Sequence, residues 1–108
     1  MALTLPLPLE TYFAAANTDD AGKVAACFAP EGVVNDEGRD IVGRDAIRAW
    51  AAEVRRKYGF HAEPLDLEDD ADRAVVTARV TGDFPGSPAD LRYRFRTADG
   101  QILALNIG

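Results

Sequence analysis

The sequence predicts an α+β domain in which three helices pack on a strongly curved antiparallel sheet. Apolar residues in the first half of the chain repeat at the spacing of a helix, whereas beyond Gly59 they alternate with a period of two. The chain has 108 residues, which suits one domain and is too short for two. We therefore expect a single domain over residues 1–108 with one functional site.

Three amphipathic segments in the first half predict the helices. The first covers residues 9–18, and the second follows the turn and N-cap residues 17–20 and stops at Pro30. The third begins at Asp45, a suitable N-cap residue, and ends at Gly59. These end signals place all three helices before the region that alternates.

Short strands fill the rest of the chain. Residues 32–36 and 41–43 predict a small hairpin around a turn at 37–40, which places Asp36 at the end of a strand. Two further hairpins follow, in which residues 61–68 pair with 73–82 and residues 91–97 pair with 101–107. A strongly bent sheet with helices on one face leaves a conical cavity open at one end, the usual setting of a small-molecule pocket.

One predicted strand carries a row of arginines. Arg92, Arg94 and Arg96 alternate with apolar residues, so they share the face opposite the core. Asp66 and Glu68 have a parity that would let them pair with this row. The row is interpreted either as a charged outer face that keeps the protein soluble or forms a dimer contact, or as an anion site.

Composition narrows the classes of partner. The net charge of −6 argues against binding to nucleic acid or to an anionic membrane surface. Cys27, the single cysteine, cannot form an internal disulfide and is expected to be buried, and His61 is the single histidine, so we expect no metal site. The first nine residues lack a basic segment, and no apolar run reaches the roughly 20 residues of a membrane span, so a reducing, cytoplasmic location is expected.

Several sequence runs resemble one known family. They are YFAAANTDD at residues 12–20, FAPEGVVND at 28–36, GRDAIRAW at 43–50, and FPGSP at 84–88 with the hairpin that follows. These runs are similar to the SnoaL-like family, which shares the cone-shaped nuclear transport factor 2-like (cystatin-like) fold with ketosteroid isomerases. The resemblance covers nearly the whole chain, but the fold hosts isomerases, cyclases, dehydratases, hydrolases and non-catalytic binders, so it implies the fold more strongly than the reaction.

The resemblance implies roles for two residues. Asp36 lies where the isomerases place the aspartate that moves a proton, and Tyr12 where they place the tyrosine that donates to the developing oxyanion. The isomerases add a second, protonated acid on a late strand, for which Asp90 is the candidate if it points inward. Two plainer interpretations stay open, in which Asp36 only stabilises the following turn and Tyr12 is an ordinary core aromatic.

Other residues are candidates for contact with a ligand. The predicted substrate-binding set is Trp50, Phe28, Tyr93, Phe84, Asp90, His61 and Asn106. Trp50 and Phe28 are equally suited to packing helices against the sheet. Pro64 interrupts the strand that begins at His61, and in one interpretation this interruption turns the His61 side chain outward. Asn106 shares the parity of apolar residues on the last strand, which would point its side chain toward the cavity.

Two functions follow from these expectations. The first is a cofactor-independent isomerase or cyclase type of enzyme, which moves a proton on a small, apolar, cyclic substrate with Asp36 as general base and Tyr12 as hydrogen-bond donor. The second is a non-catalytic ligand-binding or interaction module. In both we expect a pocket smaller than a steroid needs, and a homodimer, because an open curved sheet gains from burial across a two-fold axis.

Overall fold

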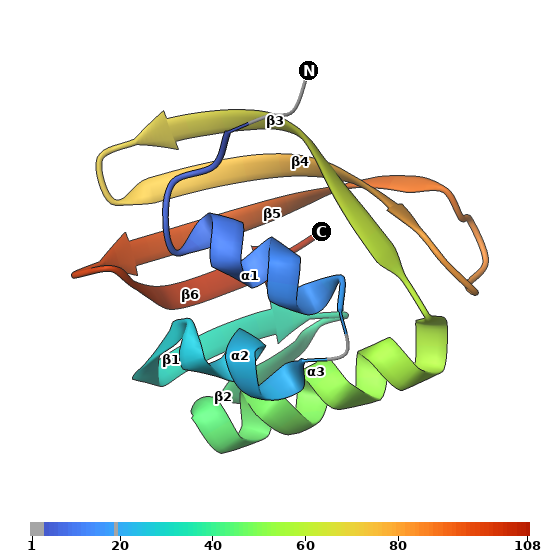
Figure 1. Ribbon diagram of the computed structural model, residues 1–108, viewed down its shortest axis with the longest axis horizontal. Helices are drawn as coiled ribbons and strands as arrows, with labels where there is room; N and C mark the ends of the chain where they lie inside the picture. The colour runs from blue at the N-terminus through green and yellow to red at the C-terminus, as the bar shows by residue number, and fades with distance from the viewer. Residues whose placement is uncertain (1–3, 19) are drawn as a thin grey trace.

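The computed structural model describes residues 4–18 and 20–108, in three helices and a sheet of six strands (Figure 1). The helices are α1 (Leu9–Ala16), α2 (Ala21–Ala26) and α3 (Arg44–Tyr58). The strands are β1 (Phe28–Asp36), β2 (Arg39–Val42), β3 (His61–Asp70), β4 (Arg73–Thr81), β5 (Ala89–Ala98) and β6 (Gln101–Ile107). The predicted α+β class, with helices packed on a curved sheet, is therefore confirmed.

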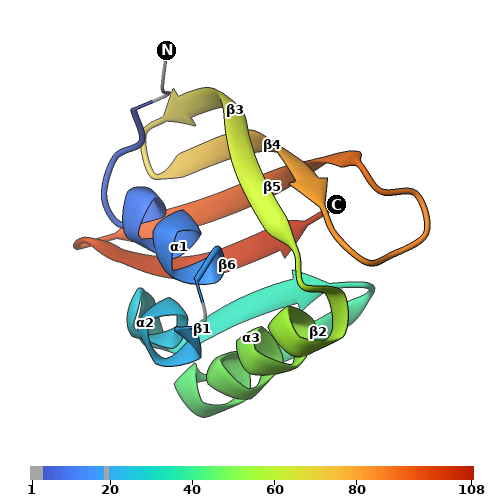
Figure 2. The same ribbon diagram turned by 45° about the vertical axis from the view of Figure 1, so that its right-hand side comes forward.

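The sheet has the strand order β2-β1-β6-β5-β4-β3 and bends around the helices (Figure 2). Four of its five strand pairs are antiparallel, but β1 runs parallel to β6. The expectation of a wholly antiparallel sheet is thus corrected at this one pair. The parallel pair joins the first hairpin to the last strand, and this places the end of β1 against the middle of the sheet.

The second helix is shorter than predicted. It ends at Ala26, and Phe28 already pairs with Ile102, so Pro30 lies inside β1 and not at a helix end. The register of β1 against β6 shifts between Phe28 and Val33, an irregularity that accommodates a proline without a ladder hydrogen bond. The backbone N–H of Ile102 donates to the carbonyl of Cys27 at 2.9 Å, which ties the chain to the sheet directly after the helix.

The ends of α3 follow from its sequence. Gly59 adopts the left-handed conformation with φ of 53°, and its N–H donates to the carbonyl of Arg55, as the predicted stop requires. At the other end Gly43, and not Asp45, is the N-cap, and Asp45 lies in the first turn, where its charge complements the helix dipole. The helix therefore ends as predicted, whereas its N-cap lies two residues earlier than predicted.

Aromatic rings form the centre of the core between α1 and the sheet. Tyr12 and Phe13 on α1 contact Tyr93 and Phe95 on β5 with ring centroids 5.0 to 6.3 Å apart. Phe28 packs edge-on to Tyr12 with its centroid 6.2 Å away and is fully buried. Cys27 is buried as predicted. This cluster fixes the position of α1 over the sheet, and with it the direction of the Tyr12 side chain.

A bulge in β6 changes which of its side chains face the core. Arg96 pairs with Ala104 and Thr97 with Ile102, so Leu103 is an extra residue on β6. Ile102 and Leu105 are therefore both buried, although an unbroken strand would point them to opposite faces.

In the described part of the chain, no helix is long and apolar enough to cross a membrane.

Candidate functional site

A cavity of about 320 Å³ opens between α1, α3 and the sheet. Its walls come from α1, α3, the segment between α3 and β3, the end of β1 and the turn after it, the loop after β4, and strands β4, β5 and β6. The lining residues are Tyr12, Asp36, Glu37, Trp50, Val54, Tyr58, Phe60, Val80, Phe84, Pro85, Leu91, Tyr93 and Ile107. Most of the wall is therefore aromatic or aliphatic, and its two charged side chains are both carboxylates.

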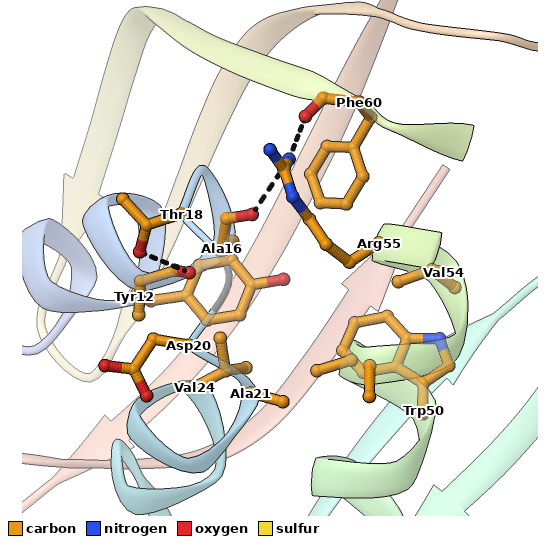
Figure 3. A pocket seen from close by; sticks show the side chains of 13 residues that line it. Tyr12, Ala16, Thr18, Asp20, Ala21, Val24, Trp50, Val54, Arg55 and Phe60 are labelled. Carbon is orange, nitrogen blue, oxygen red and sulfur yellow. Dashed lines mark hydrogen bonds between the residues drawn. The ribbon is translucent and has the colours of Figure 1, made fainter. Parts of the chain in front are cut away.

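A smaller void lies between the three helices and shares one wall with the cavity (Figure 3). Its volume of about 20 Å³ is close to the space that one water molecule needs. Figure 3 shows the Tyr12 hydroxyl pointing from α1 toward α3, where Trp50 and Val54 face it. Arg55 closes this end of the molecule by donating to the backbone carbonyls of Ala16 and Phe60.

Asp36 is the last residue of β1, and α3 holds its carboxylate. The indole Nε1–H of Trp50 donates to Asp36 Oδ2 at 3.0 Å. Burial raises the pKa of the Asp36 carboxyl, and the nearby Glu37 charge raises it further, whereas the Trp50 hydrogen bond and the Arg39 charge lower it. The result is a half-buried carboxyl with a pKa above the ordinary aspartate value, which strengthens it as a base.

Two buried tyrosines extend into the cavity beside Asp36. The residues Tyr12 and Tyr93 are only 3% and 5% exposed. Neither hydroxyl has a hydrogen-bond partner among the described residues. No side-chain polar atom that is fully sealed from solvent lacks a partner there, so both hydroxyls keep access to open space, and both tyrosines line the cavity. They can therefore bind an atom of a ligand.

Both phenols keep their protons. Burial raises the pKa of Tyr12 and of Tyr93, and the negative charge of Asp36 raises both further. A protonated phenol donates a hydrogen bond, so the pair supplies two donors in a wall that is mostly aromatic or aliphatic. The geometry thus places the Asp36 carboxylate as an acceptor and two neutral phenols as donors in one cavity.

Glu37 is a lining residue that the sequence reasoning did not select. It occupies the hairpin turn after β1 in the left-handed region, with φ of 54°, next to Gly38 with φ of 72°. Asparagine or glycine is favoured there, and the left-handed conformation costs other residues about 1–2 kcal/mol. The Tyr58 hydroxyl donates to Glu37 Oε1 at 3.1 Å, and the Tyr58 ring contacts Phe84 edge-on. A glutamate at a turn position that favours asparagine or glycine was the one feature of the sequence that could have drawn attention to Glu37.

The structure brings five of the predicted site residues together. They are Tyr12, Asp36, Trp50, Phe84 and Tyr93, and all of them line the cavity. Phe28 does not reach it, because it lies in the core beside Tyr12. Its predicted place in the pocket is corrected, since the strand begins at Phe28 and turns its ring into the core.

Three polar candidates lie outside the cavity. Asp90 is on the outer face of the sheet, where its carboxylate pairs with Arg79 at 3.1 Å and both side chains are about half exposed. His61 is exposed at the start of β3, because the neighbouring Ala62 takes the inward position. Asn106 is exposed and donates to Asn35, since the bulge at Leu103 reverses its parity. Their predicted placement in the pocket is wrong.

The remaining lining residues that were not predicted are aliphatic or aromatic, such as Val54 and Phe60. Their types also suit an ordinary core, so the sequence carries no signal that separates them from it. Within residues 4–18 and 20–108, no group of three or more histidine, cysteine, aspartate or glutamate side chains is arranged to hold a metal ion.

Comparisons with known proteins place the chain in a family. The model of the SnoaL-like domain matches residues 9–105. A solved structure from Sinorhizobium meliloti, described as a "putative polyketide cyclase", is 40% identical, covers 96% of this chain and 95% of its own, and superimposes with a TM-score of 0.93. The chain therefore belongs to the SnoaL-like family.

More distant structures share the fold. A Catenulispora acidiphila protein with a ketosteroid isomerase-like fold, solved with trimethylamine, is 20% identical over 97% of this chain and 86% of its own, with a TM-score of 0.87. A cystatin-fold protein from Novosphingobium aromaticivorans is 17% identical over 93% of both chains, with a TM-score of 0.77. The comparison with curated protein sequences gives no match. The nuclear transport factor 2-like fold predicted from the sequence is confirmed.

Proposed function

We propose that this protein is an enzyme of the isomerase or cyclase type that moves a proton on a small, mostly apolar, cyclic substrate without a cofactor. The observation that carries the proposal is the arrangement of Asp36 with Tyr12 and Tyr93 in one cavity. A basic carboxylate and two protonated phenols meet there in an apolar wall. This is the set of groups that proton removal next to a carbonyl requires.

The proposed reaction uses each of these groups once. The Asp36 carboxylate takes a proton from a carbon next to the substrate carbonyl, and the electron pair of the C–H bond moves onto the carbonyl oxygen to form an enolate. The Tyr12 hydroxyl donates a hydrogen bond to that oxygen, and Tyr93 is the candidate second donor. Protonated Asp36 then returns the proton to another carbon. In the ring-closing case the enolate carbon attacks a second carbonyl, the first carbonyl re-forms, and protonated Asp36 gives its proton to the alkoxide made from the second carbonyl.

Family and size support the same class. The cyclase-named relative is 40% identical to this chain over nearly its full length. Ring closure of a polyketide requires a carbon nucleophile next to a carbonyl, so it needs the same first proton transfer. A cavity of about 320 Å³ lies at the small end of ligand pockets, which suits a substrate of one or two rings.

The proposal is tested by hydrogen exchange. The protein is incubated in D₂O with a panel of small cyclic ketones and β-diketones, and loss of the α-proton signal is followed by NMR. We expect catalysed exchange for at least one member, and a reduction of about 10²-fold or more in Asp36→Asn, because general base catalysis contributes about 10²–10⁴-fold. Asp40→Asn, which changes an exposed aspartate on β2 outside the lining, is the matched control. Exchange that survives in Asp36→Asn contradicts the assignment of the base.

One observation favours the alternative, a non-catalytic ligand-binding module. Asp90, the candidate for the second acid of the isomerases, faces solvent and pairs with Arg79. In that case the cavity binds apolar ligands equally well in the parent protein and in Asp36→Asn, and no ketone exchanges its α-protons faster than in buffer. The two measurements together separate a binder from an enzyme.

A further inference from the structure

The cavity has a one-sided set of charges. Asp36 and Glu37 are its charged lining residues, and no lysine, arginine or histidine side chain is among the described residues that line it. Arg39 and Lys57 lie close by, since Arg39 acts on the Asp36 carboxyl and Lys57 Nζ is 5.1 Å from the Tyr58 ring centroid. Both are exposed to solvent, where their fields are screened. A cleft with charges of one sign and apolar walls concentrates its field on the ligand.

Aromatic rings surround that negative charge. Six of the thirteen lining residues are aromatic, namely Tyr12, Trp50, Tyr58, Phe60, Phe84 and Tyr93. The face of an aromatic ring attracts a cation, and cages of such rings bind organic ammonium ions. Arg55 and Lys57 already stack on Phe60 and Tyr58, and Tyr12, Trp50 and Tyr93 are at most 5% exposed. The aromatic surface left for a ligand is therefore Phe84 and the parts of these buried rings that line the cavity. An anionic ligand would instead meet two carboxylates, with Arg39 and Lys57 near them but outside the lining.

Glu37 is held in position for a ligand at the mouth. The hairpin turn forces it into the left-handed conformation, and the Tyr58 hydroxyl binds one of its two carboxylate oxygens. Its other oxygen has no hydrogen-bond partner among the described residues. Tyr12 and Tyr93 line the same space and are buried, whereas Glu37 is exposed. A ligand that spans the cavity therefore has an oxygen acceptor toward the phenols and a positive or donating group toward Glu37.

We propose that the cavity takes small organic ammonium ions in preference to uncharged or anionic molecules of the same shape, and that Glu37 binds the ammonium group at the mouth. This proposal rests on the proposed function, which makes the cavity the substrate site, and adds that the substrate carries a positive charge. It concerns binding alone, so its outcome is separate from that of the exchange assay.

The test uses three small molecules that differ in charge and share one shape. Choline carries a trimethylammonium group, 3,3-dimethylbutan-1-ol replaces its nitrogen by carbon, and 3,3-dimethylbutanoate carries a negative charge. Trp50 is the single tryptophan and lines the cavity, so its fluorescence reports binding directly. We expect choline to bind about tenfold more tightly than the alcohol, in line with a cation–π gain, and the carboxylate to bind most weakly. Equal affinity for choline and the alcohol, or no saturable signal with any of the three, overturns the proposal.

Two variants locate the effect at the mouth. Glu37→Gln keeps the size of the side chain and its acceptor for Tyr58 but removes the charge, so the preference for choline over the alcohol should fall at least threefold. Glu31→Gln removes the same charge from an exposed position of β1 outside the lining, and should leave the preference unchanged. If both variants lose the preference for choline equally, the preference comes from the net charge of the protein, and the role of Glu37 is refuted. Unchanged preference in Glu37→Gln refutes it as well.

Discussion

The pKa of Asp36 is raised by some neighbours and lowered by others. The hydrogen bond from Trp50 lowers it, and a conservative substitution of Trp50 can remove this hydrogen bond. Burial raises the pKa of the Asp36 carboxyl, whereas the indole N–H stabilises the carboxylate and lowers it. Proton removal needs the ionised form, so activity should rise as the pH increases through this pKa. Burial and the Trp50 hydrogen bond therefore act in opposite directions on the strength of the base and on the pH at which it becomes available.

We expect Trp50→Phe to raise the pKa of Asp36 further, because the phenyl ring keeps most of the packing and cannot donate the hydrogen bond. A ¹³C NMR titration of the Asp36 carboxyl measures the shift directly, and the rise of activity with pH should move to higher pH by the same amount. Ile47→Val, a buried change on the same helix away from the cavity, should lower stability without moving the titration. An unchanged Asp36 titration in Trp50→Phe would limit Trp50 to a packing role.

Sequence reasoning found the inner wall of the site but not its mouth. The resemblance to the SnoaL-like family pointed to Asp36 and Tyr12, and strand alternation placed Tyr93 on the apolar face of its strand. Asn106 was predicted on the wrong face because the bulge at Leu103 switches the faces of the residues that follow it in β6. No residue type in that strand indicates a bulge. Glu37 was missed although its residue type is unusual for a turn position with positive φ, because its contact with Tyr58 joins the turn to the end of a helix far along the chain, and local patterns do not encode that contact.

At the scale of elements, the corner between α3 and β3 forms one wall of the cavity. Tyr58 and Phe60 flank this corner, and the chain after β4 packs against it, where Asp83 N–H donates to the Tyr58 carbonyl at 2.8 Å. A Cβ atom added at Gly82 would lie 3.0 Å from that carbonyl oxygen and 3.1 Å from the Phe60 Cα. Both neighbours are backbone atoms, so the glycine allows a close approach that a side chain would prevent.

Gly82→Ala should therefore destabilise the fold and disturb the cavity together. We expect a loss of about 1–3 kcal/mol, as for other overpacking substitutions, and weaker ligand binding reported by Trp50 fluorescence. Gly22→Ala in α2 is the control, since a Cβ there meets only the Asp20 side chain at 3.8 Å, and alanine in a helix should stabilise by up to about 1 kcal/mol. Denaturant unfolding of both variants checks the prediction, and equal stability of the two would contradict the close-approach argument.

The elements themselves were largely predictable, and the exceptions share a cause. The strand after α2 begins at Phe28 although Pro30 follows, because pairing with β6 outweighs the local tendency of proline to break a strand. The parallel pairing of β1 with β6 was also not predicted, since strands of this length suit either orientation. Local patterns thus located most helices and strands, whereas partners distant in sequence decided where β1 starts and how it pairs.

At the scale of the whole molecule, the outer face of the sheet carries two opposite charge rows. Arg92 and Arg94 on β5 are exposed, and so are Asp66 and Glu68 on β3, two strands away. The register sets Asp66 and Arg92 on either side of Thr77, and Glu68 and Arg94 on either side of Val75. The sequence suggested that these rows pair within the chain, but among the described residues the one ion pair is Arg79 with Asp90.

This pattern is self-complementary about a two-fold axis. If the outer faces of two copies meet with the axis along β4, the acidic row of each copy lies opposite the basic row of the other. We therefore expect a homodimer through this face, with a mass by light scattering of twice the 11.6 kDa chain. The variant R92E/R94E should be monomeric, and so should D66R/E68R, because each brings like charges together twice.

Mixing the two variants gives the decisive measurement. In a one-to-one mixture every acidic group again faces a basic group, so a heterodimer should form although neither variant dimerises alone, and high salt should weaken it. Simple loss of folding cannot produce this recovery, since a misfolded chain would not regain a partner. A monomeric parent protein, or a mixture that stays monomeric while the parent is dimeric, would show that charge pairing across this face does not hold two copies together.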